Sequence, residues 1–332
     1  MADGSSTDHA LTNEPIRVRP AWAVPTLAED VARAFAHRPR ELSPKYFYDA
    51  RGSALFDAIC EQPEYYPTRT EAALLEAHAE ALIQQARPQH VVELGSGTAR
   101  KTETLLAACE RSGLRPAYWP FDVCPEVVEE SAERLGARFP WLRVQGLVGD
   151  YTAGLRHLPR PAGRCLFVFL GGTIGNFTEA DGAVMLREIA RRMGPQDRLL
   201  LGADRVKDRS TLEAAYDDAA GVTAEFNRNV LWVLNRALGG DLDPEGFGHR
   251  AWYNELEERI EMHLEALRPQ EVHFRVLASS FEFAAGETLR TEISRKFSAP
   301  RLGALLDEAG LAVVEEQQDA DFPYSVTLCV RP

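Results

Sequence analysis

One segment, residues 90–101 with the sequence HVVELGSGTARK, constrains the fold of this chain more than any other. A short apolar run ends in Glu93, a Gly-Ser-Gly turn follows, and a helical pattern begins after the turn. Gly95 and Gly97 can adopt positive φ angles and place no Cβ in the way of a ligand. The helix that follows offers unpaired N–H groups at its start. The segment therefore predicts the strand, turn and helix that open an α/β nucleotide-binding fold.

The turn departs from the dinucleotide fingerprint Gly-x-Gly-x-x-Gly, because Arg100 stands where the third glycine would fall. This departure argues against a nicotinamide-dependent oxidoreductase. With Glu93 two residues before Gly95, the turn instead resembles the Glu-x-Gly-x-Gly loop of S-adenosylmethionine-dependent methyltransferases. Taken alone, the segment also leaves open an ordinary Gly-rich turn between a strand and a helix.

The bulk properties of the chain narrow its class. Its 332 residues can bury a full core in one large or two modest domains. A formal net charge of −13 disfavours a nucleic-acid binder. Five scattered cysteines without a CxxC pair indicate neither a disulfide framework nor a zinc site. No apolar run is long enough to span a membrane and the N-terminus has no apolar signal segment, so we expect a cytoplasmic protein without a membrane partner.

Strands and helices alternate through the middle of the chain. A first strand is predicted to lead from residue 90 to the glycine loop, and further strands at 117–122, 142–148, 166–170 and 198–203. Helices are predicted at 70–86, 101–109, 126–139 and 180–193. This βαβα rhythm predicts a Rossmann-like α/β fold, a parallel sheet with helices on both faces. The sheet domain is predicted to comprise residues 71–206 and 297–332.

The rhythm breaks after the fifth strand. Residues 208–238 are predicted to be mostly helical, and strands follow them. We expect residues 207–296 to fold with residues 21–70 as a second, α+β, substrate-binding domain. Residues 1–20, rich in Ser, Asp, Thr, Asn and Pro, are predicted to form a flexible arm.

A late hairpin is predicted from residues 272–283 and 288–297. Strict alternation along its second strand would place Arg290, Glu292, Ser294 and Lys296 on one face and Leu289, Thr291 and Ile293 on the other. A solvent-facing polar strand is one interpretation of this pattern. The other is a ligand site, because a carboxylate beside a hydroxyl suits a ligand that presents an N–H donor, such as an imidazole.

Two polar residues follow predicted strands of the sheet domain. Asp122 closes the second strand, where an acidic side chain can accept hydrogen bonds from ribose hydroxyls. Asn176 ends a Gly-rich loop after the fourth strand, close to where the reactive group of a cofactor is expected. Asn176 could equally be a turn residue that tolerates left-handed backbone.

Seven motifs in order make a resemblance specific. They are Tyr46–Asp49, Pro63–Glu71, Glu93–Gly97 with Lys101, Gly171–Asn176, Tyr216–Thr223, Phe226–Asn229 and Thr291–Ser294. Together they resemble the histidine-specific family of S-adenosylmethionine-dependent methyltransferases, which methylate the α-amine of L-histidine in ergothioneine biosynthesis. The resemblance runs from about residue 43 to residue 297 and more weakly to the end. It implies a class I methyltransferase sheet plus the second domain.

The resemblance also implies site residues, carried over position by position. S-adenosylmethionine would be bound by Gly95, Lys101, Asp122, Asp150 and Tyr151. L-histidine would be bound by Tyr65, Asn176, Tyr216, Met262, Glu292 and Ser294. In this scheme Asn176 and Tyr216 hold the α-carboxylate, Glu292 and Ser294 hold the imidazole, and Met262 lines the side-chain site. Tyr48 would lie close to both ligands and forms the implied catalytic set with Asn176 and Tyr216. Tyr151 stands where the family is expected to have Phe, which affects only the fine adenine contact.

The implied reaction is trimethylation of the α-amine to hercynine, the first step of ergothioneine biosynthesis. A sulfonium methyl needs only an aligned neutral nitrogen, and an α-amine is partly neutral at cellular pH, so no strong base is required. The alternative is an N-methyltransferase of the same fold acting on another amino acid, such as tryptophan. Glu292 argues against an indole, which has less need of a carboxylate. A non-catalytic binding protein is disfavoured by the intact polar positions, and we expect a metal-free monomer.

Overall fold

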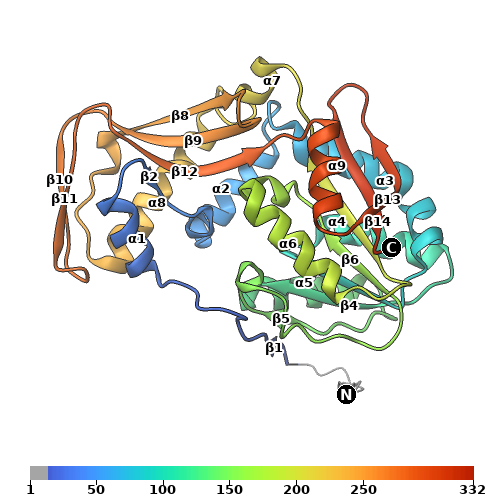
Figure 1. Ribbon diagram of the computed structural model, residues 1–332. Coiled ribbons are helices and arrows are strands. Elements are labelled where there is room, and N and C mark those ends of the chain that lie inside the picture. Colours follow the sequence, from blue (N-terminus) through green and yellow to red (C-terminus); the bar gives the residue numbers. More distant parts are fainter. Residues whose placement is uncertain (1–13) are drawn as a thin grey trace. The chain divides into compact units, whose positions relative to one another are not determined.

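The computed structural model describes residues 14–332 and divides into two compact units. The first, called the sheet unit below, comprises the chain up to residue 24, residues 70–205 and residues 297–332. The second, called the insertion unit, comprises residues 25–69 and 206–296. Figure 1 labels many of the helices and strands of both units. The functional roles predicted for the two domains stay predictions.

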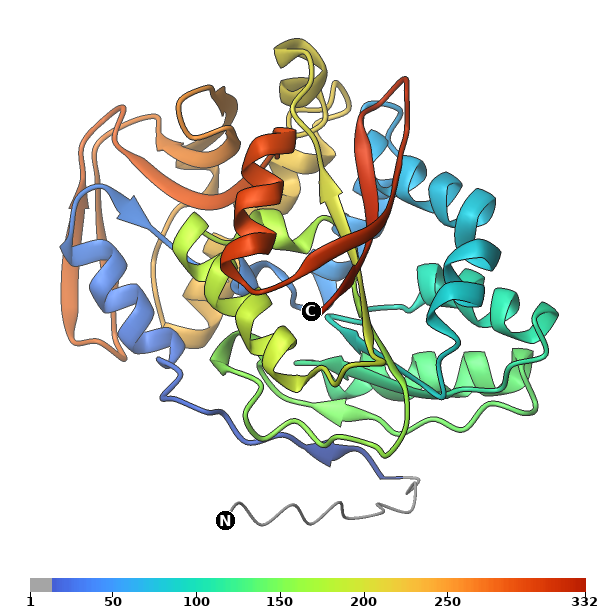
Figure 2. The same ribbon diagram turned by 45° about the vertical axis from the view of Figure 1, so that its right-hand side comes forward.

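Within the described residues, the sheet unit holds one eight-stranded sheet in the order β1-β5-β4-β3-β6-β7-β14-β13. Its strands are β1 (Ile16–Arg17), β3 (His90–Leu94), β4 (Ala117–Asp122), β5 (Leu147–Val148), β6 (Cys165–Phe169), β7 (Arg198–Asp204), β13 (Ala312–Gln318) and β14 (Tyr324–Val330). Neighbouring strands run parallel from β1 to β7. β14 is antiparallel to both β7 and β13, and Figure 2 shows this red hairpin beside the yellow β7. The predicted Rossmann-like sheet is therefore confirmed.

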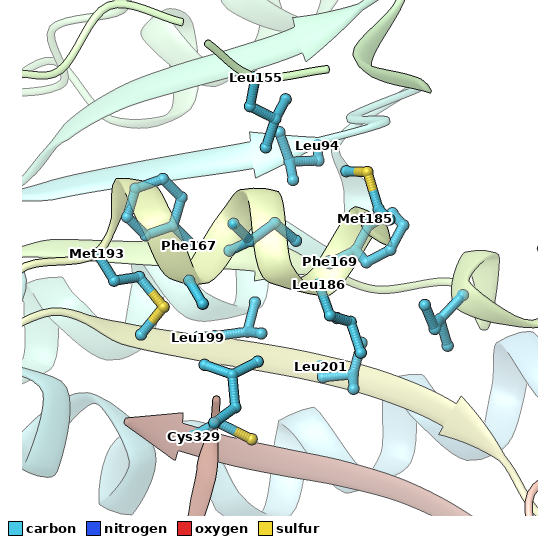
Figure 3. Packing of buried hydrophobic residues seen from close by; sticks show 14 of the residues in the cluster. Leu94, Leu155, Phe167, Phe169, Met185, Leu186, Met193, Leu199, Leu201 and Cys329 are labelled. Carbon is cyan, nitrogen blue, oxygen red and sulfur yellow. The ribbon is translucent and has the colours of Figure 1, made fainter. Parts of the chain in front are cut away.

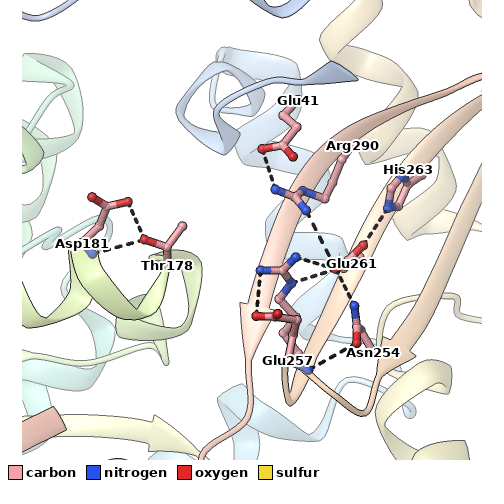
Figure 4. A network of polar contacts seen from close by, with 9 residues as sticks. Glu41, Thr178, Asp181, Asn254, Glu257, Glu261, His263 and Arg290 are labelled. Atoms are coloured by element: carbon pink, nitrogen blue, oxygen red, sulfur yellow. Dashed lines mark hydrogen bonds and ion pairs between the residues drawn. The ribbon is translucent and has the colours of Figure 1, made fainter. Parts of the chain in front are cut away.

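Helices cover both faces of this sheet because its central strands are apolar on both sides. The helices are α3 (Tyr66–Ala86), α4 (Arg100–Arg111), α5 (Pro125–Arg138), α6 (Glu179–Arg192) and α9 (Ala299–Glu308), with 3-10 turns η2 (Tyr151–Ala153) and η3 (Thr173–Asn176). In β6, Phe167 and Phe169 pack with Met185 and Leu186 of α6, as Figure 3 shows. The alternate β6 residues join the core cluster formed by α3, α4 and α5 on the other face. Helix α6 is capped by Thr178, whose Oγ1 accepts a hydrogen bond from the Asp181 N–H at 3.2 Å (Figure 4).

Two predictions for this unit are wrong in part. The predicted flexible arm at 1–20 lies outside the described residues up to residue 13, but Ile16 pairs in parallel with Leu147 and extends the sheet. The predicted third strand at 142–148 is reduced to β5 and one bridge between Tyr118 and Val144. The Gln145 side-chain amide donates to the Glu14 carbonyl at 3.0 Å, so residues 142–148 bond to the N-terminal residues as well as to β4.

A buried carboxylate joins four parts of the sheet unit. Glu71 of α3 is fully buried. Its carboxylate accepts hydrogen bonds from the Gly171 N–H at 2.9 Å and from the Tyr324 hydroxyl at 2.6 Å. It also forms an ion pair with Lys101 of α4. One side chain thus ties α3 to α4, to the loop after β6 and to β14.

The insertion unit is built around two small sheets. In the described part of the chain its helices are α1 (Leu27–Ala36), α2 (Ala50–Cys60), α7 (Arg209–Ala214) and α8 (Val222–Leu238), with 3-10 turns η1 (Pro44–Phe47) and η4 (Pro244–Gly246). A four-stranded sheet has the order β2-β12-β9-β8, and β10 pairs with β11. These strands are β2 (Arg40–Glu41), β8 (Phe247–Asn254), β9 (Arg259–Ala266), β10 (Gln270–Phe274), β11 (Ser279–Phe283) and β12 (Thr288–Arg295).

The predicted hairpin of residues 272–283 with 288–297 is wrong. The first of these segments folds back on itself: β10 and β11 pair antiparallel across a turn at residues 275–278, in which Ala278 has a φ of 47°. β12 instead pairs with β9 and β2. The predicted turn at 284–287 serves as a connection, with the Gly286 N–H bonded to the Ala266 carbonyl at 2.8 Å.

A β-bulge also corrects the predicted faces of β12. Arg290 lies opposite His263, whereas Glu292 lies opposite Met262, so Thr291 is an extra residue in the ladder. Arg290 therefore shares the face of His263 and Glu261, and Figure 4 shows it between Glu41 and Glu261. Strict alternation predicted Arg290 and Glu292 on one face; the bulge places them on opposite faces.

The position of Glu71 makes a glycine obligatory in β7. A Cβ added at Gly202 would lie 2.0 Å from Glu71 Oε1. Gly202→Ala should therefore displace a buried, paired carboxylate and lower the free energy of unfolding by about 3 kcal/mol or more. Gly136→Ala is the matched control, because its Cβ would meet nothing within 4 Å and it lies inside α5. This control should stabilise by roughly 0.5–1 kcal/mol. Chemical denaturation of both variants measures the difference, and equal stability for both would contradict the role of Glu71.

Candidate functional site

The glycine loop after β3 has the conformation expected for a ligand-binding turn. Gly95 and Gly97 have φ angles of 68° and 47°. A Cβ added at Gly97 would find nothing within 4 Å, so the backbone there borders open space. Asp122, at the end of β4, accepts hydrogen bonds from the Gly97 N–H at 3.0 Å and the Cys124 N–H at 3.1 Å. Its carboxylate thus fixes the loop and also lies where an acidic partner for a ribose is expected.

Tyr151 lies against the same loop. Its hydroxyl is 3.3 Å from the Cβ position of Gly95, and its ring packs edge-on against Phe121 and Phe169. The preceding Asp150 caps η2 by accepting from the Thr152 N–H at 2.9 Å. Gly95, Asp122, Asp150 and Tyr151 are therefore brought together at the carboxyl ends of the parallel strands, where ligands bind in open α/β sheets.

Lys101 and Asn176 lie near this group but in different settings. The Lys101 ammonium is paired with Glu71 and lies 3.5 Å from the Cβ position of Gly171. A direct contact of Lys101 with a cofactor stays a prediction. Asn176 ends η3 and is half-buried, and its side-chain amide makes no hydrogen bond to any residue in 14–332.

The acidic residue of the loop motif, Glu93, has a raised pKa. Glu93 is buried at the end of β3 and accepts a hydrogen bond from the Tyr118 hydroxyl. Burial raises the pKa of Glu93 to about 7, although the hydrogen bond from Tyr118 opposes this rise. Glu93 therefore lies inside the sheet, beneath the loop, and is not exposed at the loop surface.

In the insertion unit, the Tyr216 hydroxyl and Ser294 Oγ form a hydrogen bond of 2.7 Å, and both residues are buried. The Tyr216–Thr223 motif is held in place by Asp218, which caps α8 by accepting from the N–H groups of Val222 at 2.9 Å and Thr223 at 2.7 Å. The structure thus brings together two residues predicted to hold opposite ends of the substrate.

Aromatic rings extend from Tyr216 in a row of edge-on contacts. The Tyr65 ring lies 6.0 Å from the Tyr216 ring, and Phe56 lies between Tyr65 and Tyr48. Burial raises the pKa of Tyr65 well above its ordinary value, and Tyr216 adds to the rise, so Tyr65 stays a neutral hydroxyl. The Tyr48 side chain is 46% exposed. It precedes Asp49, which accepts from the Asn229 amide at 2.8 Å and so joins two of the sequence motifs.

Glu292 and Met262 face each other across β12 and β9. Met262 is buried in the aromatic core of the unit, and Glu292 is half-buried beside it. Burial raises the pKa of Glu292 to about 7, whereas the Lys296 ammonium lowers it in part. A carboxylate in apolar surroundings with a cation nearby is suited to accept an N–H from a ligand.

The sequence reasoning assigned no role to two residues that the structure makes central. Glu71 was part of a motif but had no function attached to it. Lys296 was predicted on the face of Glu292, and its ammonium indeed donates to Ser294 Oγ at 2.9 Å. The period-two pattern of β12 was the available signal for Lys296, whereas no local pattern reveals a carboxylate whose partners are distant in sequence.

The raised pKa of Glu93 predicts a pH dependence of stability. In the unfolded chain Glu93 ionises near its ordinary pKa of about 4.3, but in the folded protein only near 7. Folding therefore retains a proton between these values, and the contribution of Glu93 to stability is lost as the pH rises through this window. Glu93→Gln removes the titration. The difference in unfolding free energy, variant minus wild type, should therefore rise by on the order of 2–3 kcal/mol as the pH increases from about 5 to about 8. Denaturation at both pH values measures it, and a constant difference would contradict the buried protonation.

The described residues, 14–332, hold neither a metal-binding cluster nor a membrane-spanning helix. No three His, Cys, Asp or Glu side chains in this range gather closely enough to hold a metal ion. In the same range, no helix is both long enough and apolar enough to cross a membrane.

Comparisons with known proteins identify the family of the chain. The family described as "Histidine-specific methyltransferase, SAM-dependent" matches residues 27–331. A histidine N-alpha-methyltransferase of Mycolicibacterium smegmatis is 45% identical, over 93% of this chain and 96% of the relative. The Mycobacterium tuberculosis protein of the same name is 43% identical, over 92% and 95%. The ergothioneine biosynthesis protein 1 of Neurospora crassa is 31% identical over 68% of this chain and 28% of its own length. The chain belongs to the S-adenosylmethionine-dependent histidine-specific methyltransferase family.

Proposed function

We propose that this protein transfers three methyl groups from S-adenosylmethionine to the α-amino group of L-histidine, giving hercynine for ergothioneine biosynthesis. The observation that carries the proposal is the buried polar group of the insertion unit. A carboxylate at Glu292 and hydroxyls at Tyr216 and Ser294 lie in an aromatic and aliphatic core. Hydrogen bonds with each other and with Lys296 hold the two hydroxyls at fixed positions, and a few fixed polar groups among apolar side chains suit the binding of a small polar ligand. The names of the mycobacterial relatives support histidine as the acceptor.

The cofactor half-site belongs to the sheet unit. S-adenosylmethionine is assigned to a set that combines the open glycine loop with nearby polar side chains: Gly95, Lys101, Asp122, Asp150 and Tyr151. The open space at Gly97 and the carboxylate of Asp122 fit a nucleoside bound at this loop. When bound, S-adenosylmethionine supplies an electrophilic methyl group.

Histidine is assigned to Tyr48, Tyr65, Asn176, Tyr216, Met262, Glu292 and Ser294, the residues that the family resemblance implies. Asn176 and Tyr216 hold the α-carboxylate in this proposal. Glu292 and Ser294 hold the imidazole, and Met262 lines its surroundings. The task of these side chains is orientation, because a neutral amine attacks a sulfonium methyl without further activation. The aromatic rings of Tyr48 and Tyr65 can accommodate the growing ammonium charge.

Monomeric state, metal independence and a cytoplasmic location stay predictions from the sequence.

The direct test incubates the protein with S-adenosylmethionine and each of the twenty amino acids, followed by mass spectrometry of the products. Only histidine should gain three methyl groups, and fragmentation should place all of them on the α-nitrogen. A ring-methylated product, or methylation of another amino acid in place of histidine, would refute the proposed function.

Selectivity should depend on Glu292. A site built to hydrogen-bond a substrate N–H rejects ligands that lack it, because its own polar groups are then left unpaired. Glu292→Ala should lower kcat/KM for histidine by about 2 kcal/mol or more, roughly thirtyfold. Glu292→Gln should be milder, since its amide oxygen can still accept one hydrogen bond.

The matched control for this prediction is Glu265→Gln. Glu265 lies on the neighbouring strand β9 and forms an ion pair with Arg250 at 2.6 Å. Its loss should leave kcat/KM for histidine within about twofold, a barrier change of about 0.4 kcal/mol. If Glu292→Ala behaves like this control, Glu292 is not a substrate ligand.

A further inference from the structure

Asn227 of α8 is a fully buried amide in the insertion unit. Its amide nitrogen donates to the His263 carbonyl at 3.0 Å and lies 2.8 Å from Nδ1 of His249. Its amide oxygen accepts a hydrogen bond from the Thr291 hydroxyl at 2.6 Å. One helical side chain therefore bonds to the three neighbouring strands β8, β9 and β12.

The partners of this amide fix the direction of each hydrogen bond around it. A carbonyl can only accept, so the amide nitrogen must face His263, and its second hydrogen is then directed at His249 Nδ1. Because Nδ1 accepts, the imidazole carries its proton on Nε2, which donates to the Tyr216 carbonyl at 2.9 Å. Burial lowers the pKa of His249, although the bond to the Tyr216 carbonyl opposes this change. The lowered pKa agrees with a neutral ring.

Asn227 thereby connects the two groups assigned to opposite ends of histidine. On one side, His249 holds the backbone of Tyr216, which is assigned to the α-carboxylate. On the other side, Thr291 is the extra residue of the β-bulge, and the bulge sets the face of Glu292, which is assigned to the imidazole. The spacing between the two ends of the substrate site therefore depends on one amide.

We propose that Asn227 is a positioning residue for L-histidine: it holds Tyr216 and Glu292 at the spacing that lets them contact both ends of the amino acid. The inference rests on the proposed function. The two amide hydrogens and the amide oxygen of Asn227 are bonded within the protein, so it acts on a ligand through its neighbours. A substrate held at both ends is sensitive to this spacing, since a misplacement of about 1 Å can lower a rate roughly a hundredfold.

A purely structural role is the competing explanation, and Asn235 provides the comparison. It lies about two turns further along α8. Its side chain donates to the Leu242 carbonyl at 2.8 Å and accepts from the Leu242 N–H at 3.0 Å, and Leu242 has no assigned ligand role. Loss of either asparagine removes hydrogen bonds and lowers the free energy of unfolding. Under the proposal, only loss of Asn227 also disturbs the substrate site.

The test compares Asn227→Ala with Asn235→Ala. Both variants should be less stable in chemical denaturation. Asn227→Ala should lower kcat/KM for histidine about tenfold or more, mainly through KM, whereas Asn235→Ala should leave kcat/KM within about twofold. Affinity for S-adenosylmethionine, measured by calorimetry, should change by less than about twofold in both variants, because the cofactor is assigned to the sheet unit.

Thr291 supplies a second pair of variants that leaves the amide in place. Thr291→Val removes the hydroxyl at similar side-chain size and takes away the donor to Asn227, so kcat/KM for histidine should fall about tenfold. Thr291→Ser keeps the donor and should stay within about twofold of wild type. Because both residues act through one hydrogen bond, adding Thr291→Val to Asn227→Ala should lower kcat/KM little further.

An unchanged kcat/KM in Asn227→Ala, an equal loss in Asn235→Ala, or equal values for Thr291→Val and Thr291→Ser would each overturn the role of Asn227. If Asn227→Ala does not fold, the Thr291 pair decides. If the wild-type protein gives no methylated histidine, the proposed function fails. If it does and Thr291→Val matches it, only the positioning role fails.

Discussion

The carboxylate of Glu71 is the interaction on which the architecture of the sheet unit depends. It is fully buried, accepts hydrogen bonds from the Gly171 N–H and the Tyr324 hydroxyl, and forms an ion pair with the Lys101 ammonium. A charge in this position is tolerated only because every partner is present, and removing one would leave an unpaired ion in the core. The glycine loop helix α4 and the Gly-rich loop after β6 are thus held by the same two oxygen atoms. The geometry of the loops proposed to bind the cofactor is therefore set by an ionic group in the core.

The insertion unit follows the opposite principle. Its core is dominated by aromatic and aliphatic side chains, and polar groups are concentrated at a few positions on β12 and at Tyr216. Neighbouring side chains hold these positions through hydrogen bonds. Asp218 caps the helix after Tyr216, and Lys296 bonds both hydroxyls of the polar group. Selectivity in such a site comes from the arrangement of a small number of groups, since the surrounding rings supply shape and exclude water.

Much of this molecule could be predicted from residue patterns, and the failures have physical causes. The glycine loop, the parallel strands and the helices of the sheet unit follow local periodicity, which the structure confirms. Helix α6, predicted at 180–193, spans Glu179–Arg192 in the structure. The hairpin error arose because residues 272–283 look like one long strand, and only pairing with distant chain shows where it turns. Contacts such as Glu71 with Tyr324 join residues far apart in sequence, so no local pattern predicts them. The family resemblance suggested a set of site residues, but it gave no role to Glu71 or Lys296.

The bulge at Thr291 gives this fold a sensitivity to chain length. Thr291 is held by hydrogen bonds to the Asn227 side chain at 2.6 Å and the Met262 carbonyl at 3.1 Å, so the extra residue has its own anchoring partners. Every side chain of β12 after this point owes its face to that one insertion. Loss of a single residue here would exchange the two faces of the strand without altering any other amino acid. Such a deletion would turn Glu292 and Ser294 away from the face that they share with Met262.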